Sequence, residues 1–83
     1  MDRAKRLRSE KLREKLLQIR KGLNLSQNEL IAELKLKGII YQANVSEYES
    51  GKREPPLPIL LRYARLAGIS TDMLIDDKAK LNF

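Results

Sequence analysis

The large hydrophobic residues of this chain recur at helical spacing, and no stretch alternates apolar and polar residues with the period of a β-strand. The first apolar stripe follows an i, i+4, i+7, i+11 pattern and consists of Leu12, Leu16, Ile19 and Leu23. The basic residues of this segment lie mostly off the stripe, and they are Lys11, Arg13, Lys15 and Lys21. A helix with one apolar face buries that face against other elements. We therefore expect an all-α fold.

The next segment carries clear stop and start signals. Asn24, or alternatively Gly22, is expected to end the first helix in the left-handed conformation. Ser26 and Glu29 then match a capping box, in which each side chain accepts a hydrogen bond from the other residue's backbone N–H. This box starts a second helix, which we expect to end at Gly38. The buried side of that helix would comprise Leu30 and Leu34.

A short third helix is expected from residue 41 to residue 50, with Gly51 as its stop signal. It would bury Val45 and Tyr48. Its outward side is polar but carries no Lys or Arg, and it comprises Gln42, Ala43, Ser46, Glu47 and Ser50. Amide and small side chains of this kind suit the major groove of DNA, where Gln or Asn can pair with adenine through two hydrogen bonds.

The remaining residues predict two further helices. All three prolines lie in the connection 52–58, which they stiffen, and Pro58 suits the first position of a fourth helix. Gly68 would end that helix, and Ser70 would cap a short fifth one, with residues from Asp76 onward forming a short tail. The expected apolar face of the fourth helix comprises Leu57, Leu60, Leu61, Ala64 and Ala67. In the fifth helix we expect Met73 and Leu74 to be buried.

The composition argues against several classes of function. Because the chain has no cysteine and no histidine, it lacks a thiol nucleophile, an imidazole base and any zinc-finger spacing. We therefore expect no enzyme activity, no metal site and no cofactor. No apolar run approaches the roughly 20 residues of a membrane span, and the N-terminus has no apolar signal core. These features predict a cytoplasmic protein with no membrane partner.

The positive charge is concentrated at the N-terminal end. The net charge is +6, and residues 1–21 hold nine basic and three acidic side chains, whereas the rest of the chain holds eight of each. Such a segment is either a solvated chain end or an arm that is attracted to phosphate groups. The second interpretation favours nucleic acid as the partner and a location at the nucleoid.

Four sequence blocks resemble the Cro/repressor-type, or XRE-like, helix-turn-helix family. They are SQNEL at 26–30, VSEYESGKREP at 45–55, LLRYA at 60–64 and GISTDML at 68–74. The resemblance implies a compact, five-helix, lambda-repressor-like domain at residues 10–77. A basic arm at residues 1–9 would precede this domain, and a tail at residues 78–83 would follow it. In that fold the third helix lies in the major groove and the second crosses the DNA backbone.

The resemblance also implies roles for individual residues. Gln27 would touch phosphate or support the first base-reading side chain, and Lys52 and Arg53 match the loop that follows the phosphate backbone. Arg20 and Glu49 match a partly buried ion pair that joins the first and third helices in some relatives and is structural. The positions matching the base-reading part of the recognition helix are Gln42, Ala43, Asn44, Ser46 and Glu47.

Some of these residues allow two interpretations from their chemistry. Gln42 is expected to read a base, since its position and chemistry agree, and the alternative is a solvated amide at the start of the helix. Asn44 either reads a base or satisfies a backbone amide of the turn. Glu47 either accepts a hydrogen bond from cytosine or is a surface residue that phosphate repels. Tyr41 can offer its hydroxyl to a phosphate, whereas Tyr48 matches a core position.

The interval from Leu34 to Val45 is about four residues longer than is usual in the family. Either the second helix gains about one turn through Lys37, or the turn itself widens around residues 39–40. Placing the recognition helix by counting back from Val45 assumes that the extra residues precede Tyr41.

The leading hypothesis is a transcriptional regulator, expected to be a repressor, that binds double-stranded DNA sequence-specifically and without catalysis. The family usually binds two-fold sites as a homodimer. Apolar groups near the C-terminus either form a dimer surface or pack back on the same chain, and these are Ile75, Leu81 and Phe83.

The alternative hypothesis is an antitoxin-like interaction module. Such a module holds a partner protein and binds DNA mainly as part of that complex. Three acidic residues near the presumed DNA face favour it, namely Glu47, Glu49 and Glu54.

Overall fold

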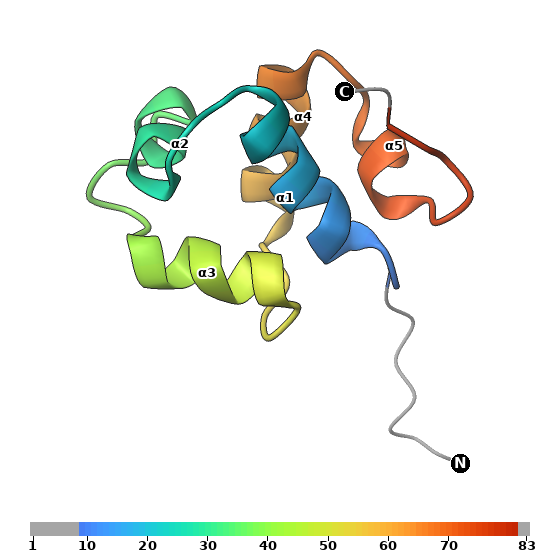
Figure 1. Ribbon diagram of the computed structural model, residues 1–83, viewed down its shortest axis with the longest axis horizontal. Helices are drawn as coiled ribbons and strands as arrows, with labels where there is room; N and C mark the ends of the chain where they lie inside the picture. The colour runs from blue at the N-terminus through green and yellow to red at the C-terminus, as the bar shows by residue number, and fades with distance from the viewer. Residues whose placement is uncertain (1–8, 82–83) are drawn as a thin grey trace.

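The computed structural model describes residues 9–81, and five helices make up this part of the chain (Figure 1). They are α1 (Leu12–Gly22), α2 (Gln27–Glu33), α3 (Gln42–Ser50), α4 (Leu57–Ala67) and α5 (Thr71–Ile75). The only β-type pairing in the described part is an isolated bridge between Lys37 and Ile40. The predicted all-α fold is therefore confirmed. None of the described helices is long and apolar enough to cross a membrane.

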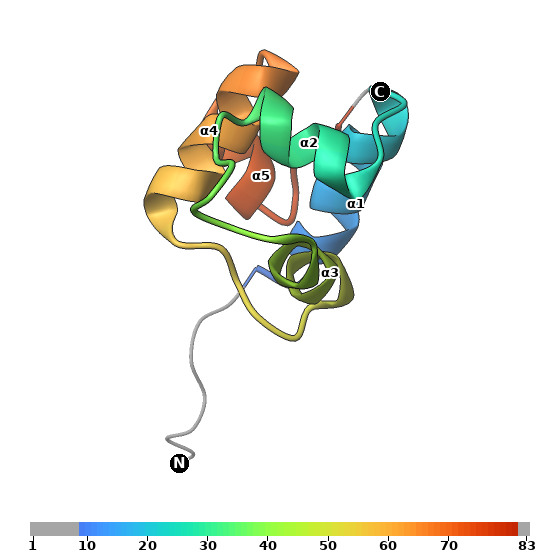
Figure 2. The ribbon, with the colours of Figure 1, turned by 90° about the vertical axis from the view of Figure 1, so that its left-hand side faces the viewer.

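All five helices contribute to one hydrophobic core. Its fully buried side chains are Leu16, Ile19, Leu30, Val45, Tyr63 and Leu74. In Figure 1, α3 runs along the lower edge of the molecule, with α1 and α2 above it and α5 at the right. Figure 2 views α3 almost end-on and shows α2 crossing above it. This packing leaves one long side of α3 open to solvent.

The expected end of α1 is correct. Asn24 has φ 58°, in the left-handed region, and its backbone N–H bonds the carbonyl of Lys21. The N–H of Leu25 bonds the carbonyl of Arg20, which completes a Schellman motif. The side chain of Leu25 then packs against the core. One basic residue of α1 was placed wrongly, because Lys15 is not off the buried face but is only 5% exposed.

The capping box at the start of α2 is confirmed by both of its hydrogen bonds. Ser26 Oγ accepts from the Glu29 N–H at 3.0 Å, and Glu29 Oε1 accepts from the Ser26 N–H at 2.8 Å. The expected end of this helix at Gly38 is wrong. The helix ends at Glu33, and Lys35 takes the left-handed conformation with φ 60°. The extra residues therefore widen the turn and do not lengthen the helix.

Tertiary contacts explain this early end. The N–H groups of Lys35 and Leu36 bond the carbonyls of Ala32 and Ile31, as in a Schellman motif. Leu36 is thereby turned into the core, where it is 4% exposed. From α4, Arg62 Nη1 donates to the carbonyl of Leu34 at 2.9 Å and to that of Lys35 at 3.1 Å. These bonds satisfy helix-end carbonyls that further helix would otherwise have used.

The fourth helix begins one residue earlier than expected, at Leu57, and its buried face is rotated from the predicted one. Leu57 and Leu61 were expected in the core but are 76% and 40% exposed. The buried residues are Ile59, Leu60, Tyr63 and Ala64. Tyr63 is fully buried and therefore sets the orientation of the helix. Gly68 ends α4 at φ 72°, as predicted.

The segment after α5 folds back onto α1. Ser70 precedes α5 as expected, without a side-chain cap bond, and Leu74 is fully buried while Met73 is half-buried. Asp77, which was expected to belong to a short tail, accepts hydrogen bonds from the N–H groups of Glu10 and Lys11. Leu81 packs against the core, so it does not form an exposed dimer surface. Phe83 and residues 1–8 of the expected arm lie outside the described residues.

Candidate nucleic-acid interface

The open side of α3 presents uncharged side chains. Val45 and Tyr48 are buried, as predicted, and hold the helix against the core. On the opposite side, four of the predicted outward residues are exposed, and they are Gln42, Ala43, Ser46 and Ser50. Because Gln42 is the first residue of α3, its amide stands at the N-terminal end of the helix.

A polar network joins α2 to the middle of α3. Gln27 Nε2 donates to Glu49 Oε1 at 3.2 Å, and Gln27 Oε1 accepts from Ser46 Oγ at 3.2 Å. Both ends of the Gln27 amide are therefore used within the protein. Of the two roles expected for Gln27, this geometry favours support of α3 over direct contact with phosphate.

Glu49 also pairs with α1. Arg20 Nε donates to Glu49 Oε2 at 2.7 Å, and Arg20 Nη2 donates to Glu49 Oε1 at 3.0 Å. Arg20 Nη1 donates in addition to the carbonyl of Leu25 at 3.0 Å. The Arg20 and Glu49 side chains are only 16% and 7% exposed, and their hydrogen bonds raise the pKa of Arg20. This bidentate ion pair fixes the position of α3 relative to α1.

The N-terminal end of α3 is capped by its own residues. Asn44 Oδ1 accepts from the Tyr41 N–H at 2.8 Å, so its carbonyl oxygen satisfies an amide of the turn. The hydroxyl of Tyr41 donates to the carbonyl of Gly38 at 3.3 Å, and the Tyr41 side chain is 63% exposed. Tyr41 is exposed and Asn44 is half-buried, so both residues lie at the edge of the exposed surface of α3.

Two exposed cations, Lys52 and Arg53, follow the C-terminal end of α3. Gly51 has φ 82°, and the N–H of Lys52 bonds the carbonyl of Glu47, so the chain turns sharply there. Arg53 Nε donates to Glu47 Oε1 at 3.2 Å. The Glu47 carboxylate, which could repel phosphate, is therefore paired with a cation. The pair also holds Arg53 beside the open side of α3.

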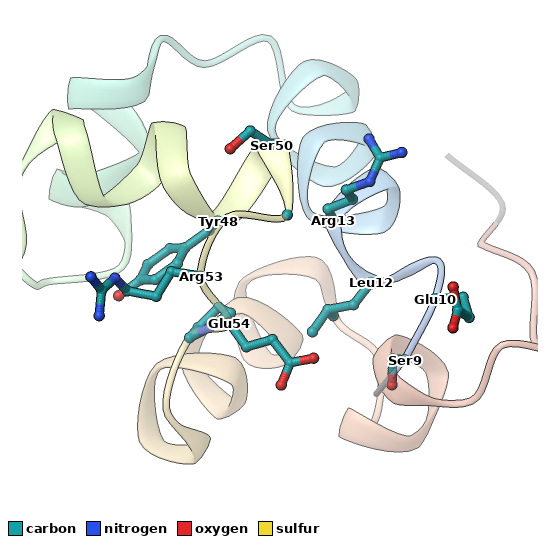
Figure 3. Close-up of a pocket in the computed structure, with 10 residues that line it drawn as sticks. Ser9, Glu10, Leu12, Arg13, Tyr48, Ser50, Arg53 and Glu54 are labelled. Carbon is teal, nitrogen blue, oxygen red and sulfur yellow. The ribbon is translucent and has the colours of Figure 1, made fainter. Parts of the chain in front are cut away.

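A cavity of about 220 Å³ lies between the start of α1 and the loop after α3 (Figure 3). The guanidinium groups of Arg13 and Arg53 point away from each other, and the Glu54 carboxylate extends between the loop and α1. These charges do not converge on one point, as an anion site would require. In the described part of the chain, no group of three or more acidic side chains could hold a metal ion.

Sequence reasoning missed three basic residues that shape this surface. A Cβ at Gly51 would lie 2.6 Å from Arg13 Cδ, so the stem of Arg13 packs against the loop that carries Lys52. Arg62 holds the end of α2 from α4. Lys37 lies in the widened turn before α3. No local pattern identifies Arg13 and Arg62, because their partners are distant in the sequence.

The family described as a helix-turn-helix domain matches residues 14–80 of the chain. No curated protein matches the sequence. The match covers all five helices apart from the first two residues of α1, and it includes the capped α2, the exposed α3 and the cationic loop described above. The chain belongs to the XRE-like helix-turn-helix family.

Proposed function

We propose that this chain is a transcriptional regulator, acting as a repressor, that binds double-stranded DNA sequence-specifically and catalyses no reaction. The observation that carries the proposal is the open side of α3, which presents an amide and small side chains and has the cations Lys52 and Arg53 at its C-terminal end. Uncharged groups that fit the major groove supply discrimination between bases. Cations beside them supply affinity for the phosphate backbone.

Each residue then has a role in the complex. Gln42 reads adenine, with Ala43 and Ser46 against the base edges and Asn44 and Glu47 at the margin of the groove. Tyr41, Lys52 and Arg53 contact phosphates, while Gln27 supports α3. The basic arm at 1–9 adds long-range attraction. The regulator works in the cytoplasm at the nucleoid.

A binding experiment tests this function. The protein is titrated into duplexes selected by the wild-type chain from a random pool, and into unselected duplexes, at several salt concentrations. Gln42→Ala is expected to lose about 1–3 kcal/mol of preference at one base pair. Arg53→Ala is expected to weaken binding to all sequences alike, with a shallower salt dependence. The absence of duplex binding by the wild-type protein would refute the proposal.

A homodimer on a two-fold site is part of the same proposal. Ile75, at the end of α5, is 43% exposed and remains available for a subunit contact, whereas Leu81 packs on its own chain. Sedimentation of the protein with and without DNA tests this, and a 1:1 complex on a selected site without two-fold symmetry would contradict it.

One observation supports the antitoxin-like alternative. Leu57 and Leu61 lie four residues apart on α4 and are both exposed, at 76% and 40%. Exposed apolar side chains on one helix face suit a protein partner. Under this alternative, the isolated chain binds duplex DNA weakly, and addition of the partner restores binding.

A further inference from the structure

We propose that the α2–α3 turn (residues 34–41) is a second backbone-binding element and that Lys37 binds a DNA phosphate next to the N-terminal end of α3. This inference rests on the function proposed above. It assigns a binding role to Lys37, which lies outside the recognition helix and its cationic loop.

The α2–α3 turn is held in one shape. Leu36 and Ile40 anchor it in the core at 4% and 5% exposure. Arg62 holds its first two carbonyls from α4, and the hydroxyl of Tyr41 bonds the carbonyl of Gly38. In Figure 2 the segment passes beside α4 before it descends to α3. A turn constrained in this way loses little backbone conformational entropy on binding.

The outward side of this turn is cationic and apolar. Lys35 and Lys37 are exposed, and Ile39 and Tyr41 are 65% and 63% exposed. Residues 34–46 contain no acidic side chain. Among the described residues, Lys37 forms no ion pair with an acidic side chain. Its charge is therefore available to an external anion.

A hollow of about 200 Å³ beside the turn supplies a place for that anion. It is lined by Asn28, Ile31, Lys37, Gly38, Ile40 and Tyr41. Lys37 and Asn28 bring hydrogen-bond donors to its rim, from the turn and from α2, and the two isoleucines form an apolar floor. Donors above an apolar floor suit the phosphate and sugar of a nucleic-acid strand, whose anionic and apolar groups alternate. No carboxylate is among the residues that line the hollow, which favours this occupant over a basic protein segment.

Cations lie near both ends of α3, and the length of this helix matches the width of the major groove. The nine residues of α3 span about 13 Å, and the major groove is about 12 Å wide. Lys52 and Arg53 follow the C-terminal end of the helix. Lys37 lines the hollow together with Tyr41, the residue that precedes the first turn of α3. A helix of this length seated in the groove brings phosphates of the flanking strands within reach of both ends. The uncharged reading surface is thus bracketed by cations.

Backbone neutralisation tests the proposal directly. Selected duplexes are prepared with a single uncharged methylphosphonate at each backbone position in turn, and binding by the wild-type protein and by Lys37→Ala is measured. One position near the base read by Gln42 is expected to weaken wild-type binding but to leave Lys37→Ala binding unchanged. Lys37→Ala is also expected to reduce the slope of log K against log salt by about 0.9, with sequence preference unchanged. Lys37→Arg should restore the slope.

Lys80→Ala serves as the matched control, since it removes one exposed positive charge from the segment after α5. If Lys37→Ala and Lys80→Ala behave alike, or if the methylphosphonate effects do not depend on Lys37, the inference is overturned while Gln42-dependent binding remains intact. Failure of the wild-type protein to bind any duplex would instead overturn the function on which the inference rests. The inference would also be overturned if Lys37→Ala lowered the affinity for a partner protein but not the affinity for DNA.

Discussion

Most polar side chains around α3 form hydrogen bonds within the protein, and under the proposed function these bonds limit which of them can read a base. Asn44 caps the start of α3, Gln27 bridges to Ser46, and Glu47 pairs with Arg53. Gln42 is the one long polar side chain on the open side of α3 for which the described residues provide no hydrogen bond. The preference for particular bases should therefore depend most strongly on Gln42.

Removal of only one partner of the Arg20–Glu49 ion pair should lower the unfolding free energy strongly. Glu49→Leu leaves a mostly buried guanidinium without its counter-ion, so we expect a loss of about 3 kcal/mol in unfolding free energy. The double variant Arg20→Met, Glu49→Leu should be clearly more stable than this single variant, because no unpaired charge remains. Urea denaturation measures both variants. Equal losses for the single and double variants would contradict the assignment of a coupled pair.

At Tyr63, in contrast, we expect a substitution that does not destabilise the fold. Its side chain is fully buried, and its hydroxyl has no hydrogen-bond partner among the described residues. Burial raises the pKa of this hydroxyl well above its usual value. Tyr63→Phe removes an unsatisfied polar group, so we expect stability to stay equal or to rise by up to about 1 kcal/mol. A loss of more than about 1 kcal/mol in urea denaturation would show that the hydroxyl has a partner.

At the level of the helices, α1 to α4 all end in the same way. Each is followed by a left-handed residue, and these residues are Asn24, Lys35, Gly51 and Gly68. The residue after it is apolar and faces the core in three helices, where it is Leu25, Leu36 or Ile69. After α3 it is the exposed Lys52. The same backbone motif thus anchors the ends of α1, α2 and α4 in the core, whereas at the end of α3 it presents a cation to solvent.

The end of α2 depends on Arg62 and can be tested through that residue. Arg62→Ala removes two charge-assisted hydrogen bonds from carbonyls next to the core, and we expect a loss of about 1.5 kcal/mol in unfolding free energy. Faster hydrogen exchange at the amides of Leu36 and Ile40 should accompany it. Arg65→Ala, on the same helix, is the control and should change stability by less than about 0.5 kcal/mol. Equal effects of the two variants would rule out the capping role of Arg62.

At the level of the whole molecule, α1 and α5 cap each other. Lys15 Nζ donates to the carbonyls of Met73 and Asp76, both at 2.7 Å, at the end of α5. In return, the Asp77 carboxylate accepts from the N–H groups of Glu10 and Lys11, at the start of α1. Each charged side chain complements the sign of the helix dipole that it meets. The C-terminal part of the domain is thereby joined to its first helix.

This reciprocal capping predicts an acid-sensitive contribution to stability. The two backbone hydrogen bonds hold the pKa of Asp77 below its ordinary value of 3.8. A carboxylate with a lowered pKa in the folded state stabilises the fold above its unfolded pKa, and this contribution is lost as the pH falls through the folded value. We expect Asp77→Asn to be less stable than the wild type at pH 7, with the difference disappearing at strongly acid pH.

Thermal unfolding of both proteins across this pH range measures the effect. Glu33→Gln, which neutralises an exposed carboxylate on α2, is the matched control and should not reproduce the pattern. A stability difference between wild type and Asp77→Asn that is constant with pH would contradict the role assigned to the Asp77 charge.

The sequence by itself determined the number and order of the helices and most of their ends. The capping box at Ser26, the stops at Asn24, Gly51 and Gly68, and the buried positions of α3 are local features, because each depends on residues within a few positions along the chain. The same blocks identified the family. An outer side of α3 without Lys or Arg was also predictable, since helical period alone decides which residues share a face.

Only the tertiary structure decided the end of α2, the burial of Lys15, the capping role of Asp77 and the face that α4 buries. Each depends on partners that are distant in the sequence. Arg62 of α4 holds the end of α2, two carbonyls at the end of α5 accept hydrogen bonds from Lys15, and backbone N–H groups at the start of α1 donate to Asp77. Local propensity cannot anticipate such contacts, because a charged side chain is buried only where remote backbone groups satisfy it. The widened turn and its exposed Lys37 follow from the same packing.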